Sequence, residues 1–170
     1  STGFGPDARV VEVALTELDM DLNVEFEAHS LINPGMPIPP AVSAVHHITD
    51  AMVADAPSIE EFFGRFPALK SQPIVFIAHN AKFDMGFLKN FFHEDSQTLC
   101  TVRLAKHVYP DLENYKLQTI RYTFGLDAAV RHNVNKHWKY FYPDLWEPYG
   151  CGTNYKWRHG ACIWCSIGGD

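Results

Sequence analysis

One carboxylate, Asp84, lies at a position where ligand-binding side chains are often found. Residues 73–78 form a short apolar run that ends at His79, as expected of a buried strand, and the apolar residues of 81–92 recur at helical intervals. Asp84 therefore falls near the start of a helix that follows a strand, and the carboxyl ends of strands in α/β sheets are where ligands bind. A metal ligand and a solvated acid stabilised by the helix dipole both agree with this position.

Soft metal ligands gather in a second place, close to the end of the sequence. The spacing Cys162-x-x-Cys165 is that of a zinc knuckle, and Cys151 and His159 would complete a tetrahedral site. The other spacings match no zinc pattern that we can identify, so thiols with no metal are the favoured alternative. The four Trp of this region, with Tyr140, Tyr149 and Tyr155, could stack on bases, or they could belong to exposed or disordered sequence.

Composition limits the class of protein. A chain of 170 residues with 46% hydrophobic and 20% charged residues can bury the core of one domain. It contains no apolar run long enough to span a membrane and opens with no secretion signal, so we expect a soluble, cytoplasmic protein. The net charge of −6 argues against a basic nucleic-acid coat. It does not exclude a metal-dependent enzyme, because carboxylates hold the metal ions that meet phosphate.

The pattern along the chain predicts a layered α/β or α+β domain. We expect an antiparallel hairpin, a Pro-rich loop, two helices that begin after Thr49 and Ser58, and a helix that ends at Gly125. The expected strands are residues 9–18, 24–32, 73–78 and 97–100, and the expected later helices are residues 81–92, 102–108 and 116–123.

The hexapeptide at residues 79–84, HNAKFD, is similar to the second motif of the DEDD exonuclease superfamily. This superfamily includes the proofreading subunit of bacterial DNA polymerase III and exonuclease X. Further segments agree in the family's order. Residues 1–3 resemble the end of the first motif, Asp-x-Glu-Thr-Thr-Gly, residues 39–49 resemble the substrate-wedge segment, and residues 100–105 resemble the strand-to-helix step after the second motif. The resemblance covers roughly residues 1–132 and implies a ribonuclease-H-like α/β fold with a mixed sheet flanked by helices.

The resemblance also implies an activity, that of a 3′-to-5′ exodeoxyribonuclease of the histidine subtype in replication proofreading or repair. Two Mg²⁺ or Mn²⁺ ions would serve the hydrolysis, with Asp84 as a metal ligand and His132 as the general base. The partners would be single-stranded 3′ ends of DNA and a polymerase or replication complex. The residues assigned to the terminal nucleotide and its bases are Ser1, Thr2, Val45 and His46. For His46, a solvated helix end is the alternative.

The sequence departs from the family in its metal ligands. The Asp and Glu of the first motif are absent, as is the central strand that carries them, and its loss would leave a slot beside the strand ending at Ala78. In the third motif, His-x-Ala-x-x-Asp, His137 stands at the position of the Asp, and a substitute at Asp144 follows the helix-breaking Pro143. We therefore expect residues 1–130 to be an N-terminally truncated exonuclease core, and the 170-residue chain to be inactive. A catalytically inactive relative that binds nucleic-acid ends or a protein partner is the alternative.

The composition changes near residue 131. Residues 131–170 contain all four Trp and three of the four Cys, and they are poor in Leu, Ile and Val. We interpret this segment as an atypical tail, either non-native to the nuclease core or disordered. A frameshift would explain the change, and translating the other reading frames past codon 131 tests it. Absence there of a Leu/Ala-rich segment with the third motif would count against the hypothesis.

Overall fold

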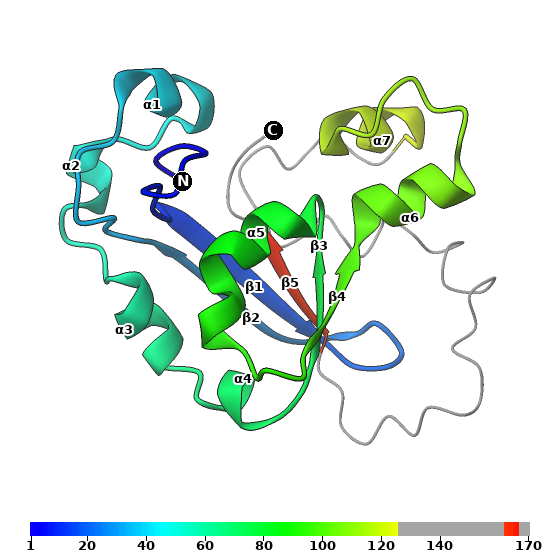
Figure 1. Ribbon diagram of the computed structural model, residues 1–170, viewed down its shortest axis with the longest axis horizontal. Coiled ribbons are helices and arrows are strands. Elements are labelled where there is room, and N and C mark those ends of the chain that lie inside the picture. Colours follow the sequence, from blue (N-terminus) through cyan, green and yellow to red (C-terminus); the bar gives the residue numbers. More distant parts are fainter. Residues whose placement is uncertain (126–161, 167–170) are drawn as a thin grey trace.

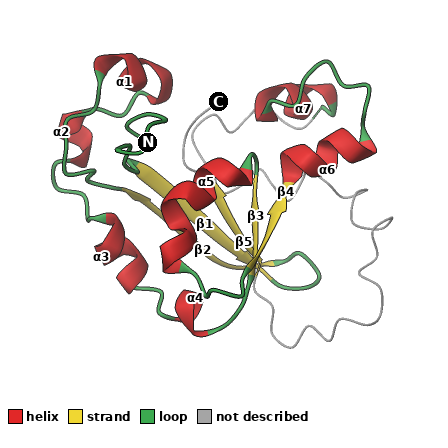
Figure 2. Ribbon diagram, in the orientation of Figure 1, coloured by secondary structure: helices red, strands yellow, loops and turns green. Residues whose placement is uncertain are grey.

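A mixed sheet with helices packed against it forms the described part of the chain, residues 1–125 and 162–166, in this computed structural model (Figure 1). The strands are β1 (Glu12–Leu18), β2 (Val24–Leu31), β3 (Val75–Ala78), β4 (Gln97–Cys100) and β5 (Cys162–Ser166). The helices are α1 (Pro40–His46), α2 (Asp50–Val53), α3 (Ile59–Gly64), α4 (Ala68–Ser71), α5 (Ala81–Leu88), α6 (Thr101–Val108) and α7 (Leu117–Thr123), with a 3-10 turn η1 (Lys89–Phe91). The predicted α/β class is confirmed (Figure 2).

The sheet has the strand order β2-β1-β5-β3-β4. The predicted hairpin is confirmed, since β1 and β2 pair antiparallel with Ala14 opposite His29. β5 pairs antiparallel with β1 and parallel with β3, and β3 pairs parallel with β4. The position between the hairpin and β3, which we expected to be a vacant slot, is thus filled by β5. The pairing satisfies backbone groups that would otherwise be left open on β1 and β3.

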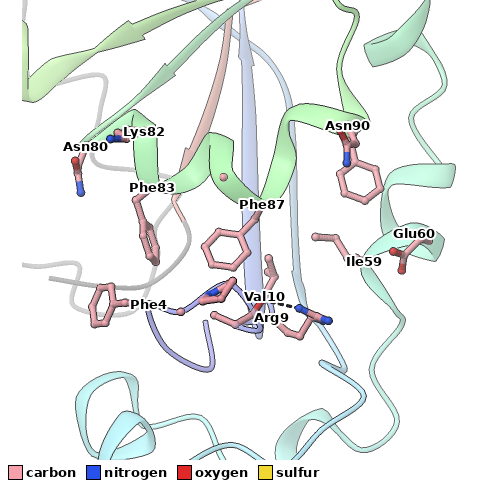
Figure 3. Close-up of a pocket in the computed structure, with 15 residues that line it drawn as sticks. Phe4, Arg9, Val10, Ile59, Glu60, Asn80, Lys82, Phe83, Phe87 and Asn90 are labelled. Carbon is pink, nitrogen blue, oxygen red and sulfur yellow. Dashed lines mark hydrogen bonds between the residues drawn. The ribbon is translucent and has the colours of Figure 1, made fainter.

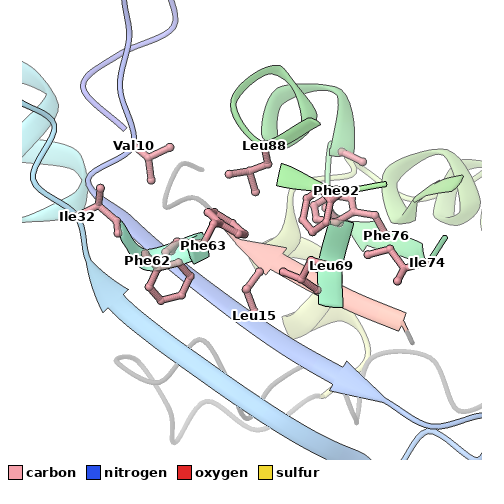
Figure 4. Packing of buried hydrophobic residues seen from close by; sticks show 13 residues of the cluster. Val10, Leu15, Ile32, Phe62, Phe63, Leu69, Ile74, Phe76, Leu88 and Phe92 are labelled. Carbon is pink, nitrogen blue, oxygen red and sulfur yellow. The ribbon is translucent and has the colours of Figure 1, made fainter. Parts of the chain in front are cut away.

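The main core lies between the sheet and the helices α3 and α5 (Figure 4). Leu15 of β1, Phe76 of β3 and Leu88 of α5 belong to one buried cluster, which also contains Phe62 and Phe63 of α3. Leu88 and Phe76 have no measurable exposure to solvent. Because these contacts come from strands on both sides of β5, they fix the side of α5 that faces the sheet.

Two helix boundaries lie where the capping residues in the sequence predicted them. The side chain of Ser58 accepts a hydrogen bond from the Glu61 amide at 3.1 Å, and the Ser58 amide donates to the Glu61 carboxylate at 2.7 Å. This is the predicted capping box. Gly125, with φ of 64°, follows α7 as predicted, because a left-handed residue there satisfies the last carbonyl groups of the helix.

Other boundaries differ from the prediction. Helices α1 and α4 were not predicted, and α1 begins at Pro40 directly after the Pro-rich loop, where proline is tolerated because the first helical amides need no partner. The predicted helix over residues 81–92 ends at Leu88, and η1 tightens the following turn. None of the described helices has the length and apolar character needed to cross a membrane.

Candidate functional site

The junction between β3 and α5 is built around His79. The Tyr115 carbonyl can only accept a hydrogen bond, so the Nε2–H of His79 donates to it at 2.8 Å. Nδ1 is then the acceptor for the hydroxyl of Thr101, 2.9 Å away. Burial lowers the pKa of His79, which agrees with this neutral ring. Asn80 follows with φ of 63° and turns the chain into α5.

Asp84 lies on the inner face of α5. It is one turn after Ala81 and one turn before Leu88, and both of these residues are buried in the main core. Only 4% of Asp84 is exposed, so a solvated acid at the helix start is wrong. A carboxylate withdrawn from water needs polar or charged partners. Asp84 is therefore a buried carboxylate at the start of α5, and its role as a metal ligand stays a prediction.

His46, at the end of α1, contacts the first residue of the chain. The Ile48 amide donates to His46 Nδ1 at 3.0 Å, so the proton is on Nε2, which donates to the Ser1 carbonyl at 3.2 Å. Desolvation lowers the pKa of His46. The structure thus brings together two of the residues that the sequence analysis assigned to the terminal nucleotide.

Thr2 is held by reciprocal hydrogen bonds with Arg9. The Thr2 amide donates to the Arg9 carbonyl at 2.7 Å, and the Arg9 amide donates to Thr2 Oγ1 at 2.9 Å. Ser1 and Thr2 are both buried, whereas Val45 on α1 is 58% exposed. Val45 is accordingly the side chain in this group with the most surface for a ligand.

Glu12 is a residue of this region that the sequence analysis did not single out. Its carboxylate lies 2.7 Å from His29 Nε2 on the neighbouring strand, and its negative charge partly offsets the lowering of the pKa of His46. The signal in the sequence for Glu12 was an acidic residue in an otherwise mostly apolar strand.

The resemblance noted in the sequence implies divalent metal ions, which need several carboxylate ligands close together. Within residues 1–125 and 162–166, no group of three or more His, Cys, Asp or Glu side chains is placed to hold a metal ion. Asp84 supplies one carboxylate, and a site for two ions needs several. The described residues by themselves therefore do not fit a two-ion site.

The remaining predicted site residues fall on other parts of the chain. His132, Cys151 and His159 lie outside the described residues. Cys162 and Cys165 belong to β5, an extended strand in the sheet. The zinc site and the general base stay predictions.

Known proteins resemble this chain in sequence and in fold. A family model described as Exonuclease matches residues 1–134. A DNA polymerase III subunit epsilon-like protein of Rhodobacter capsulatus is 37% identical over 79% of the chain, and the chain spans only 20% of that protein's length. The DNA polymerase III subunit epsilon of Aquifex aeolicus is 28% identical over 92% of the chain and 83% of its own length.

A solved structure shares the fold. Exonuclease X in complex with 5′ overhanging duplex DNA superimposes with a TM-score of 0.61 at 28% identity, over 76% of this chain and 71% of that one. The ribonuclease-H-like arrangement expected from the resemblance is thereby confirmed. A family match over most of the chain, with the same fold in a solved relative, shows that the chain belongs to the Exonuclease family.

Proposed function

We propose that the activity associated with this chain is the hydrolysis of DNA from a 3′ end, in replication proofreading or repair. The carrying observation is Asp84, a buried carboxylate on the inner face of the helix that begins after β3, in a chain of the Exonuclease family. The relatives named for DNA polymerase III and the relative bound to duplex DNA support DNA as the substrate and a polymerase as a partner.

We also propose that Asp84 is one of the carboxylates that bind the divalent ions, and that the 170-residue chain alone is inactive. One carboxylate leaves most of the coordination of two cations to water. Mg²⁺-dependent shortening of a labelled oligonucleotide by this chain, abolished by Asp84→Ala, would refute the proposed inactivity.

The activity itself is tested by adding the missing acids. The variant carries a strand with Asp-x-Glu fused directly before Ser1 and the substitution His137→Asp, and it ends at residue 161, so that the position of β5 between β1 and β3 is open to the added strand. We expect this variant to shorten a single-stranded 5′-labelled oligonucleotide stepwise in Mg²⁺, because three more carboxylates then join Asp84. The matched controls are the same extension with Asn-x-Gln, and the active variant with Asp84→Asn; both should be inactive.

Two outcomes would count against the proposal. One is a folded extended variant that leaves the oligonucleotide intact, and the other is shortening that persists with Asp84→Asn. A second candidate function is a relative that binds nucleic-acid ends without cutting, which the lack of a metal-binding group among the described residues favours. Tight binding of 3′ ends by an inactive extended variant would support it.

A further inference from the structure

The edge of the sheet formed by β2 is open in the described part of the chain. β2 stands at one end of the strand order and pairs there with β1 alone (Figure 1). The Ile32 amide donates to the carbonyl of Val11, the residue before β1, at 2.8 Å. Because backbone groups alternate in direction along an antiparallel strand, the amides and carbonyls of His29 and Glu27 point away from β1. No other described backbone group pairs with them, so they can pair with a further strand.

Apolar side chains are exposed along the same strand. Phe26 is 41% exposed and Val24 is 39% exposed. The ring centroid of Phe26 lies 5.4 Å from that of Phe66, which packs against the main core. Phe26 is therefore on the face of the sheet that the helices cover, at the margin of the main core. An apolar side chain from a neighbouring strand would extend the core at this point.

The hairpin that carries this edge is strongly acidic. Residues 12–31 contain six carboxylates and no Lys or Arg, and the first Lys or Arg on either side in the sequence are Arg9 and Arg65. Glu27 is exposed and lies on the opposite face from Phe26, since successive residues of a strand alternate. It forms no ion pair with another described residue. The six acids are Glu12, Glu17, Asp19, Asp21, Glu25 and Glu27.

The β2 edge is separate from the pocket of about 660 Å³ shown in Figure 3. The N-terminal segment, the start of α3, and α5 with its flanking residues line that pocket, and no residue of β2 does. The charge of the hairpin disfavours two occupants of the β2 edge. Nucleic acid would meet carboxylates in place of the cations that it needs. A second copy of the chain, paired edge to edge, would bring six more carboxylates against the first six.

We propose that the edge of β2 binds an extended segment of another protein, in which Lys or Arg alternates with apolar residues. The segment adds a strand antiparallel to β2, as β1 does on the other side, and its backbone pairs with Glu27 and His29. Its residues on the face of Glu27 are basic, and the residues between them are apolar and pack beside Phe26. The alternation in the partner follows from the different chemistry of the two faces of β2.

The test uses a defined peptide. A fluorescein-labelled peptide of about ten residues, with alternating Lys and Val, is long enough for one strand. It is titrated with the full 170-residue chain in EDTA, and its anisotropy is recorded. Glu27→Lys should weaken binding about fivefold, because a cross-strand attraction becomes a repulsion. Glu94→Lys is the matched control, since Glu94 is an exposed acid before β4, at the other edge of the sheet, and it should leave the affinity nearly unchanged.

A second comparison tests the backbone pairing and the apolar face. In an antiparallel ladder the residues that exchange hydrogen bonds with Glu27 and His29 are the lysines. Methylation of the lysine amide nitrogens of the peptide should therefore abolish binding, whereas methylation of the valine amide nitrogens should leave most of it. A peptide with Thr in place of Val keeps the preference for strands but loses the apolar face, and it should bind more weakly.

Several results would overturn the proposal. They are equal affinities of the wild type and Glu27→Lys, an equal loss in Glu94→Lys, and equal binding of the two methylated peptides. A dimer of the chain, detected by sedimentation, that excludes the peptide would also overturn it in favour of a second copy. Both substituted side chains are on the surface, so circular dichroism should show both variants folded. No step of this test depends on the exonuclease activity proposed above.

Discussion

Removing the ring of His79 should destabilise the junction that carries Asp84. His79→Ala leaves the Tyr115 carbonyl without its 2.8 Å hydrogen bond and the Thr101 hydroxyl without its closer partner. A buried acceptor left unpaired costs about 1–3 kcal/mol, and an ordinary hydrogen bond contributes about 1 kcal/mol. Thr101 keeps a weaker alternative at the Ala78 carbonyl, 3.4 Å away. We therefore expect the free energy of unfolding to fall by about 2–4 kcal/mol.

His79→Gln is the matched variant. A glutamine amide can still donate to the Tyr115 carbonyl but offers Thr101 no equivalent of Nδ1. Its cost should be about 1 kcal/mol. The assay is urea denaturation followed by circular dichroism at 222 nm. Equal costs for the two variants, or a cost below about 0.5 kcal/mol for His79→Ala, would refute the assignment of the hydrogen bonds.

The lowered pKa of His79 predicts that the free energy of unfolding depends on pH. Burial lowers the pKa of His79 in the folded state, so below about pH 6.5 the unfolded chain binds a proton that the folded chain does not. The free energy of unfolding should therefore decrease as the pH falls from 7 to 5. His46 changes it in the same direction, since its pKa is also lowered. His79→Gln should remove only part of the slope, and an unchanged slope would contradict a neutral, partly buried His79.

Two further substitutions test the elements around the site. Ser58→Ala removes the capping box of α3 and should lower the free energy of unfolding, measured by urea denaturation, by about 1 kcal/mol. Ser58→Asp should retain most of the stability, because aspartate also caps helices. An unchanged stability in Ser58→Ala would show that the cap is unimportant. Leu88→Ala leaves a cavity at a fully buried position and should lower the free energy of unfolding by about 2–5 kcal/mol. Lys89→Ala, at the exposed neighbour, should lower it by less than about 0.5 kcal/mol. Similar losses of stability in the two variants would contradict the packing of α5.

The parts of the fold that were predictable are those encoded by neighbouring residues. The hairpin follows from period-two alternation, and the start of α3 follows from Ser58 and Glu61 within four residues of each other. The strand β5 was not predictable. Ile163 and Trp164 favour strands, but five residues in a Trp- and Cys-rich segment are too few to identify one. The pairing of β5 depends on edges presented by β1 and β3 far away in the sequence.

For the candidate site, the sequence singled out Asp84 by its motif, and the ligand-binding role of Asp84 stays a prediction; the orientation of the helix that carries it was not predictable. The hexapeptide identified Asp84, but α5 carries apolar residues on more than one side, so periodicity alone could not show which face meets the sheet. Packing of Ala81 and Leu88 against the core decides it.

The central place of β5 has a consequence for the order in which the sheet can form. Its partners on β1 are about 150 residues earlier in the sequence, so the contact order of this pairing is high. Until residues 162–166 insert, the sheet consists of two separate ladders, β2–β1 and β3–β4, each with an open edge. Open edges pair readily with other chains. The insertion of one short strand therefore sets both the rate at which the fold is completed and the time during which the chain is exposed to aggregation.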